Sequence, residues 1–207
     1  GKRKLFFSDE EVILNSIKLK NKFLSTDLKL NIIKEQSQSK ISNKLIIKNI
    51  CINSKIIKKN DVFFAIKGKK NDGNLFIKEA FDKGASFAIV NKLEKFKKIS
   101  KQIKVKNTLK FLTDASSVLR ENSLSKIVAI TGSCGKTSLK ELIGNTLQKI
   151  SNVTHSPKSY NNKFGVPLSL FNLKEKDDFG IFEIGMDKKG EIDYLSKIVK
   201  PDVSVIT

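Results

Sequence analysis

Short apolar runs and helical patterns alternate through the second half of the chain. The apolar runs predict strands at residues 126–131, 152–155, 179–184 and 202–206. The helical patterns between them predict helices at residues 137–149, 165–171 and 190–199. Because strands that alternate with helices pair in parallel, this half predicts a parallel sheet with helices on its faces.

The first half shows the same alternation on a smaller scale. Dense apolar and β-branched residues predict buried strands at residues 45–52, 61–66 and 87–90. An apolar helical face precedes the third strand and ends at Gly84, a residue suited to the left-handed position after a helix. Further helices are expected at residues 25–36 and 113–122, whereas the segment 92–110 is rich in lysine and carries no clear pattern.

These patterns predict an α/β protein with two domains. We expect a small α/β N-terminal domain over residues 23–123 and a parallel-sheet domain over residues 124–207. The segment 1–22 is a charged extension, in which Ser8 to Glu11 predict the start of a helix that runs through Ile17. The pattern of an open α/β sheet is incomplete at the last residue, so we expect the given chain to be a fragment.

The charge of the chain raises the question of nucleic-acid binding. The formal net charge is +19, but among 40 basic residues only Arg3 and Arg120 are arginines, and the lysines are spread along the whole chain. Base and phosphate recognition favours the arginine fork, so we interpret the lysines as solvated surface and expect no nucleic-acid partner. A basic nucleic-acid-binding module remains the alternative from another class.

Composition also bears on the compartment. Apolar residues make up 39% of the sequence without a run of about 18 to 20 of them, so we expect a globular protein and no membrane insertion. The cysteines, Cys51 and Cys134, lack metal-type spacing, and no signal segment opens the chain. Both features favour the cytoplasm.

A glycine-rich segment joins a predicted strand to a predicted helix, and it reads Thr131-Gly-Ser-Cys-Gly-Lys-Thr137. Glycines let backbone N–H groups surround a phosphate, and a helix N-terminus adds partial positive charge. Lys136 can reach the outer phosphates of a nucleotide, and the hydroxyl of Thr137 can ligate Mg²⁺. Ile130 stands where the full Walker A pattern has glycine, so this is the shorter Gly-x-x-Gly-Lys-Thr form of a phosphate-binding loop.

Other polar residues are candidates for the same site. Glu183 ends a predicted strand at the sheet edge where open parallel sheets bind ligands, and its carboxylate can hold Mg²⁺. Asn161 and Asn162 by themselves predict a turn and a helix start. We interpret His155, the only histidine, as structural, and Cys134 as a filler of the loop rather than a nucleophile.

Several strings of residues resemble the Mur ligases of peptidoglycan synthesis. In the second half they are Thr131-Gly-Ser-Cys-Gly-Lys-Thr-Ser138, Tyr160-Asn-Asn-Lys-Phe-Gly-Val-Pro-Leu168, Phe182-Glu-Ile-Gly-Met-Asp-Lys-Lys-Gly-Glu-Ile192 and Lys200-Pro-Asp202. The second string is similar to that of the family branch that adds D-alanyl-D-alanine. In the first half, Asn53-Ser54-Lys55 and Asn60-Asp-Val-Phe-Phe-Ala-Ile-Lys-Gly68 resemble the uridine-nucleotide-binding domain of the family, which usually has Asp-Ser-Arg at the first of these places.

The resemblance implies an ATP-dependent ligase that joins a UDP-MurNAc-tripeptide to D-alanyl-D-alanine through an acyl phosphate. It implies ATP binding by Thr131, Gly132, Ser133, Cys134, Gly135, Lys136, Thr137 and Ser138. Lys136 and Glu183 would be catalytic, and Thr137 and Glu183 would hold Mg²⁺. Contacts with the substrate are implied for Ser54, Lys55, Asn161 and Asn162. The enzyme is expected to be a monomer.

The resemblance also implies that parts of the ligase lie outside these 207 residues. In the family, the adenine pocket and a C-terminal domain come from sequence beyond this segment, which implies that these 207 residues alone cannot turn over. The string Phe7-Ser-Asp-Glu-Glu-Val12 is similar to the closing segment of the ligase that adds the third peptide residue, which leads to the hypothesis of a fusion of the two ligases. A sister ligase that adds another amino acid, a folylpolyglutamate-type ligase and a non-catalytic uridine-nucleotide binder remain alternatives.

Overall fold

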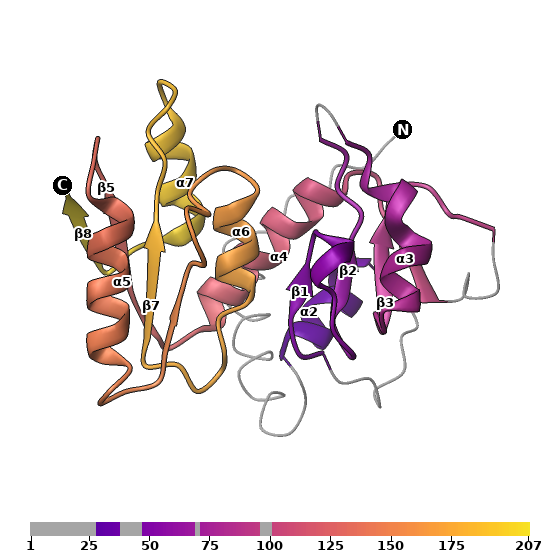
Figure 1. The fold of residues 1–207 in the computed structure, drawn as a ribbon, viewed down its shortest axis with the longest axis horizontal. Coiled ribbons are helices and arrows are strands. Elements are labelled where there is room, and N and C mark those ends of the chain that lie inside the picture. The colour runs from indigo at the N-terminus through magenta and orange to yellow at the C-terminus, as the bar shows by residue number, and fades with distance from the viewer. Residues whose placement is uncertain (1–27, 38–46, 69–70, 96–100) are drawn as a thin grey trace, which may run out of the picture.

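The computed structural model describes residues 28–37, 47–68, 71–95 and 101–207. The strands form two parallel sheets of four strands each, with helices packed against them (Figure 1). The expected α/β class with parallel pairing is therefore confirmed. The extension at residues 1–22, with its predicted helix, lies outside the described residues. Of the helices that the structure describes, none combines the length and the apolar character needed to cross a bilayer.

The first sheet has the strand order β1-β2-β3-β4, and these strands are β1 (Ile50–Cys51), β2 (Val62–Phe64), β3 (Phe87–Val90) and β4 (Gln102–Lys104). Successive side chains of a strand point to opposite faces of the sheet. Phe63 and Ala88 accordingly pack with α3 (Ile77–Asp82), whereas Phe64 and Ile89 enter the core on the other face. This unit also contains α2 (Leu28–Ser37) and the short 3-10 helices η1 (Ser54–Ile56) and η2 (Gly73–Phe76).

The second sheet has the order β6-β7-β5-β8, and these strands are β5 (Lys126–Thr131), β6 (Val153–His155), β7 (Phe179–Glu183) and β8 (Val203–Ile206). One face packs against α5 (Lys136–Leu147), and the other packs against α6 (Gly165–Phe171) and α7 (Glu191–Val199). Because all pairs are parallel, the carboxyl ends of these strands lie along one edge. Open α/β sheets bind ligands at that edge.

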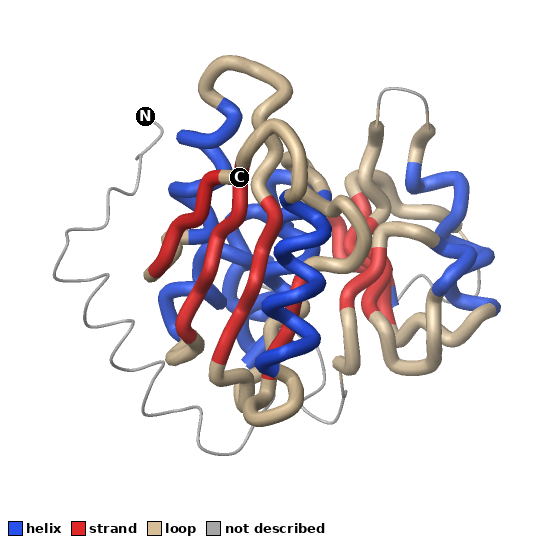
Figure 2. Tube along the Cα trace, turned by 60° about the vertical axis from the view of Figure 1, so that its left-hand side comes forward, coloured by secondary structure: helices blue, strands red, loops and turns tan. Residues whose placement is uncertain are grey.

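Helix α4 (Thr108–Asn122) runs between the two sheets, as Figure 1 shows, and in Figure 2 the strands of the two sheets lie apart with helices between them. Its residues Leu112 and Ala115 are fully buried in a core that also contains Phe64 of the first sheet and Phe182 of the second. The helix packs against α2 on one side and against α6 and α7 on the other. The two sheets therefore share one continuous apolar core.

The predicted boundaries agree closely with the second sheet and less well with the first. Strand β1 contains only Ile50 and Cys51 of the strand expected at residues 45–52, and β4 lies in the segment for which the sequence showed no pattern. Helix α4 begins at Thr108 and not near residue 113, because the Asn107 side chain accepts the Lys110 N–H at 2.9 Å and so caps the helix earlier.

Asn172 joins the second unit to the edge of the first sheet. It follows α6, and its Oδ1 accepts the N–H of Ile50 at 2.9 Å while its Nδ2 donates to the carbonyl of Ile50 at 3.2 Å. A neighbouring strand would satisfy the same two groups of β1 in a similar way. The side-chain amide therefore takes the place of a strand at this edge.

Arg120 fastens the end of α4 to the second sheet. Its Nε donates to the Val199 carbonyl at 2.9 Å, and one Nη donates to the Lys200 carbonyl at 2.8 Å and to the Asp202 carboxylate at 2.9 Å. Asp202 also accepts the backbone N–H of Ile127 at 2.8 Å. That backbone hydrogen bond is the main reason why the pKa of Asp202 is lowered, with Lys126 and Arg120 adding to it.

Candidate active site

The loop of residues 132–135 connects β5 to α5 and depends on two glycines. Gly132 has φ of 136° and Gly135 has φ of 79°, and both values are costly for a residue with a Cβ. A Cβ on Gly132 would also overlap the backbone of Thr207, which directly follows β8. Backbone conformation and close contact thus both demand glycine at the start of this loop.

Helix α5 begins with Lys136, and no side chain caps its N-terminus. The first N–H groups of a helix lack partners within the helix, so here they can bind an anion, helped by the positive end of the helix dipole. The Nζ of Lys136 donates to the Gly132 carbonyl at 2.5 Å. Within the described part of the chain, no carboxylate forms an ion pair with Lys136. The ammonium is therefore free to exchange that carbonyl for a phosphate oxygen.

Glu183 lies beside this loop at the end of β7, and it is only 1% exposed. The hydroxyl of Thr137 donates to its Oε2 at 2.7 Å, and the side-chain amide of Asn161 donates to its Oε1 at 2.8 Å. In the parallel pair of β5 and β7, Glu183 is in register with Ile130, which places the carboxylate next to the phosphate-binding loop. Residues that are far apart in the sequence thus meet at one edge of the sheet.

Asn161 belongs to the loop of residues 156–164 between β6 and α6, which packs closely against the end of β7. The Gly185 N–H donates to the Asn161 carbonyl at 2.6 Å, and a Cβ on Gly185 would lie 2.9 Å from that oxygen. The Ser156 hydroxyl accepts the N–H of Glu183 at 3.3 Å. These contacts fix the backbone from which Asn161 reaches Glu183.

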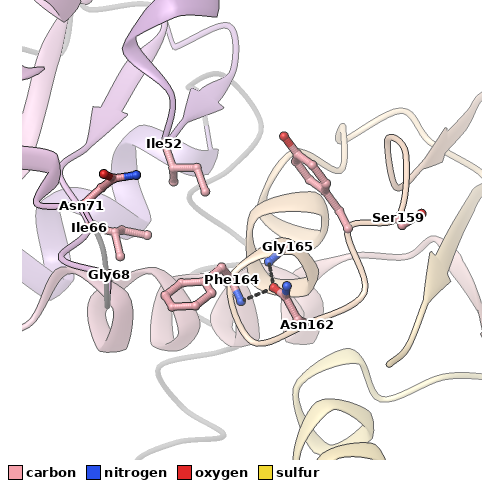
Figure 3. Close-up of a pocket in the computed structure, with 9 residues that line it drawn as sticks. Ile52, Ile66, Gly68, Asn71, Ser159, Asn162, Phe164 and Gly165 are labelled. Atoms are coloured by element: carbon pink, nitrogen blue, oxygen red, sulfur yellow. Dashed lines mark hydrogen bonds between the residues drawn. The ribbon is translucent and has the colours of Figure 1, made fainter. Parts of the chain in front are cut away.

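Asn162 has a different environment. Its Oδ1 accepts the N–H groups of Phe164 and Gly165, both at 3.0 Å, and so it forms the turn that leads into α6. Figure 3 shows these bonds and the pocket of about 320 Å³ that lies between the two units. The pocket combines apolar side chains with a few polar groups, and it is lined by Ile52, Ile66, Gly68, Asn71, Ser159, Tyr160, Asn162, Phe164 and Gly165.

The structure does not bring Ser54 and Lys55 to the phosphate-binding loop. Ser54 is buried, and its hydroxyl donates to Oε2 of Glu79 on α3 at 2.7 Å. Hydrogen bonds from Lys83 and from Ser54 lower the pKa of Glu79. Lys55 is exposed in η1, next to the carboxyl end of β1. Both residues follow the carboxyl end of β1 in the first sheet, separate from the group around Glu183.

The other candidate residues lie in the loop of residues 132–135, in α5 and at the end of β6. Ser133, Cys134 and Ser138 are exposed around the phosphate-binding loop, and the Cys134 carbonyl accepts the Thr207 hydroxyl. His155 packs against Gly144 of α5, where a Cβ would lie 2.8 Å from its Cδ2. Sequence reasoning missed Lys140, which is completely buried one turn after Lys136.

The donor atoms at this edge suit a nucleotide phosphate with Mg²⁺. The open N–H groups of α5 and the Lys136 ammonium match phosphate oxygens. The Thr137 hydroxyl and the Glu183 carboxylate are hard oxygen donors and lie within 2.7 Å of each other. The described residues contain no group of three or more His, Cys, Asp or Glu side chains around one point. Mg²⁺ is commonly held by one or two carboxylates together with substrate phosphates and water, which fits this donor set.

Comparison with known protein families agrees with this geometry. Residues 46–119 match the sequence model described as "Mur ligase family, catalytic domain", and residues 130–207 match the one described as "Mur ligase middle domain". The chain belongs to the Mur ligase family. Within the family, it is 39% identical over 166 residues to the UDP-N-acetylmuramoyl-tripeptide--D-alanyl-D-alanine ligase of Rickettsia prowazekii, covering 80% of this chain and 37% of that protein. The ligase of the same name from Buchnera aphidicola (subspecies Acyrthosiphon pisum) is 38% identical over 162 residues, with coverage of 78% and 35%.

Solved Mur ligase structures resemble the fold as well. The UDP-N-acetylmuramoylalanyl-D-glutamyl-2,6-diaminopimelate--D-alanyl-D-alanyl ligase of Acinetobacter baumannii gives a TM-score of 0.72 at 30% identity, covering 85% of this chain and 40% of that one. The MurF ligase of Thermotoga maritima, solved in complex with ADP, gives 0.63 at 32% identity, covering 79% and 38%. This Mur ligase chain thus spans well under half the length of the relatives that it matches.

Proposed function

We propose that this Mur ligase chain carries the part of an ATP-dependent ligase that binds the phosphates of ATP for transfer to the substrate carboxylate. The ligase joins D-alanyl-D-alanine to a UDP-MurNAc-tripeptide. The observation that carries the proposal is the meeting of Lys136, Thr137, Asn161 and Glu183 at the open N-terminus of α5. The substrates in the proposal come from the names of the relatives at 39% and 38% identity. ATP is supported by the ADP complex of the T. maritima relative.

The proposal divides the work between two domains. We assign the UDP-linked substrate to the domain of residues 23–123 and ATP to the domain of residues 124–207, with residues 131–138 around the phosphates. Ser54 and Lys55 lie at the carboxyl edge of the first sheet, where a ligand of a parallel sheet is expected. Asn162 lines the pocket between the two units, so a substrate that extends from the first unit towards ATP would pass it.

The proposed reaction has two steps. In the first, the terminal carboxylate of the tripeptide attacks the γ-phosphorus of ATP, ADP leaves, and an acyl phosphate forms. In the second, the amine of D-alanyl-D-alanine attacks the acyl carbon and loses a proton, phosphate leaves, and the amide bond is complete. Neither step needs a covalent bond to the protein, so the contribution of this chain is positioning and charge stabilisation.

Each residue of the site has one task in this reaction. The loop N–H groups and Lys136 stabilise the negative charge that develops on the transferring phosphoryl group. Thr137 and Glu183 would hold Mg²⁺, which neutralises phosphate charge when bound. Asn161 keeps the buried Glu183 carboxylate oriented through the 2.8 Å hydrogen bond to Oε1.

The proposal is tested by phosphate release from ATP in the full-length gene product. We expect release only when the UDP-MurNAc-tripeptide and D-alanyl-D-alanine are both present, and loss of at least about a hundredfold in rate for Lys136→Met, because one transition-state charge contact typically contributes that much. Substituting the matched surface residue Lys149→Met should leave the rate unchanged, since Lys149 is exposed beyond the end of α5. Release with L-alanyl-L-alanine or a single amino acid in place of D-alanyl-D-alanine would contradict the assigned specificity.

A further inference from the structure

Lys140 is completely buried, although lysine is among the residues least often found inside a protein. It lies on α5, four residues after Lys136 and three after Thr137, so it is on the same side of the helix as both. A buried ammonium is costly unless charges and hydrogen bonds compensate for its lost hydration. The proposed reaction gives Lys140 no task, and its burial therefore needs another explanation.

The ammonium of Lys140 has two partners. It donates to the backbone carbonyl of Lys158, and it forms an ion pair with Oε1 of Glu141 at 3.1 Å. The second carboxylate oxygen of Glu141 lies 3.8 Å from Nδ1 of His155, at the end of β6. Lys140 and Glu141 together thus connect α5 to both ends of the segment that runs from His155 to Lys158.

The carbonyl that Lys140 holds belongs to a turn with unusual backbone geometry. Lys158 has φ of 50°, a left-handed conformation that is uncommon for a residue with a side chain. Such a conformation persists where its surroundings hold it in place. A hydrogen bond from a buried ammonium to the carbonyl of the same residue provides that restraint.

The residues that follow this turn reach the active site. Ser159 places its hydroxyl 3.4 Å from the hydroxyl of Thr137. The Asn161 N–H donates to the Ser159 carbonyl at 2.9 Å, and the Asn161 side chain donates to Glu183. Lys140 itself is not hydrogen-bonded to Glu183 or Thr137, so any effect on them must pass through the loop.

We propose that Lys140 is a positioning residue that fixes the loop of residues 156–162 against α5, so that Ser159 and Asn161 stand beside Thr137 and Glu183. The inference rests on the proposed function for its link to Mg²⁺ and ATP. A fixed loop keeps the oxygen ligands of Mg²⁺ in place before the metal binds, and preorganised ligands bind with less loss of entropy. Loosening the loop should therefore weaken Mg²⁺ binding. At saturating Mg²⁺, the dependence of the rate of phosphate release on ATP concentration should stay unchanged.

The first experiment measures hydrogen exchange and needs no turnover. Lys140→Met keeps the aliphatic stem and removes the ammonium. We expect backbone amide exchange of residues 159–162 and of Gly185 to rise by about tenfold, because a charge-assisted hydrogen bond contributes roughly that factor. Exchange in β5 and α4 should stay as in the wild type. Lys149→Met, which removes an exposed charge just beyond the C-terminal end of the same helix, is the control.

The second experiment measures the Mg²⁺ dependence of phosphate release in the full-length gene product. Lys140→Met should raise the Mg²⁺ concentration for half-maximal rate by about tenfold, with the maximal rate largely restored at high Mg²⁺. Asn161→Ala should do the same, and the double variant should be no worse than Asn161→Ala alone, because both changes act through one loop. If Lys140 only stabilised the fold, Lys140→Met would leave the Mg²⁺ dependence unchanged. Its effect on the rate would then add to that of Asn161→Ala in the double variant.

The possible failures are distinguishable. If the wild type releases no phosphate with the proposed substrates, the proposed function is wrong, and hydrogen exchange still tests the link between Lys140 and the loop. If the wild type is active but Lys140→Met keeps both its loop protection and its Mg²⁺ requirement, the inference about Lys140 is wrong. Should Lys140→Met not fold, Lys140→Gln retains an N–H donor without the charge, and its effects are expected to be smaller but in the same direction.

Discussion

Replacing Arg120 by methionine removes the guanidinium that joins α4 to the end of α7. Its two donor nitrogens make four hydrogen bonds, to Val199, Lys200 and Asp202, and the side chain is only 13% exposed. A hydrogen bond to a charged group contributes roughly 1.5–3 kcal/mol, and bonds that share a donor contribute less than their sum. We therefore expect the free energy of unfolding to fall by about 3 kcal/mol, or the melting temperature by ~6–12 °C.

Thermal unfolding followed by circular dichroism, together with urea titration, measures this loss. Arg120→Lys keeps the charge but loses the planar fork, and it should recover only part of the stability. Lys126→Met is the matched control, because Lys126 also approaches Asp202, at 3.4 Å, but is 70% exposed. Its effect should stay below about 0.5 kcal/mol. Equal losses for Arg120→Met and Lys126→Met would refute the argument that burial and geometry, and not charge alone, determine the contribution.

Three other predictions concern the acid stability of the fold, the loop of residues 132–135 and the proposed ligands of Mg²⁺. Because the pKa of Asp202 is lowered in the folded state, chiefly by the N–H of Ile127, its contribution to stability is present above the ordinary pKa of about 4 and is lost as the pH falls through the lowered value. Asp202→Asn should therefore be less stable at neutral pH, and its stability should decline less on acidification below about pH 4 than that of the wild type. Gly132→Ala should lower the free energy of unfolding by about 1–3 kcal/mol in a urea titration, because φ of 136° is strained for alanine. An unchanged midpoint of the titration would contradict this. Thr137→Val should abolish the Mg²⁺-dependent part of nucleotide binding in calorimetry, whereas Thr137→Ser, which keeps the hydroxyl, should preserve most of it.

The sequence predicted the second sheet better than the first for physical reasons. The strand of residues 126–131 and the helix of residues 165–171 have the predicted bounds, because a glycine marks one limit of each and buried apolar runs fill them. Strand β1 has only two residues and β4 has three, so neither is long enough to show a period. Short strands of this kind are stabilised by their neighbours in the sheet, which the local sequence does not contain.

The candidate site was predictable in part. Lys136, Thr137 and Glu183 follow from the strand, loop and helix order, since parallel strands bring their carboxyl ends to one edge. The contact between Asn161 and Glu183 joins residues 22 positions apart, and only the folded loop reveals it. Lys140 could not be found from the sequence, because a lysine within Lys-Thr-Ser-Leu-Lys-Glu reads as part of an exposed helix face. Its burial results from the packing of the segment that ends at Lys158.

The pairing of Asn172 with Ile50 has a consequence for association between molecules. The outer edge of a sheet is a template on which another chain can add a strand, and proteins avoid this by covering such edges. Here one amide side chain occupies the N–H and the C=O of Ile50, so this position of β1 offers no backbone groups to a second chain. The variant Asn172→Leu would uncover them, and we expect it to self-associate. The contact between Asn172 and Ile50 thus joins the two units and also blocks the addition of a strand from a second copy at this position.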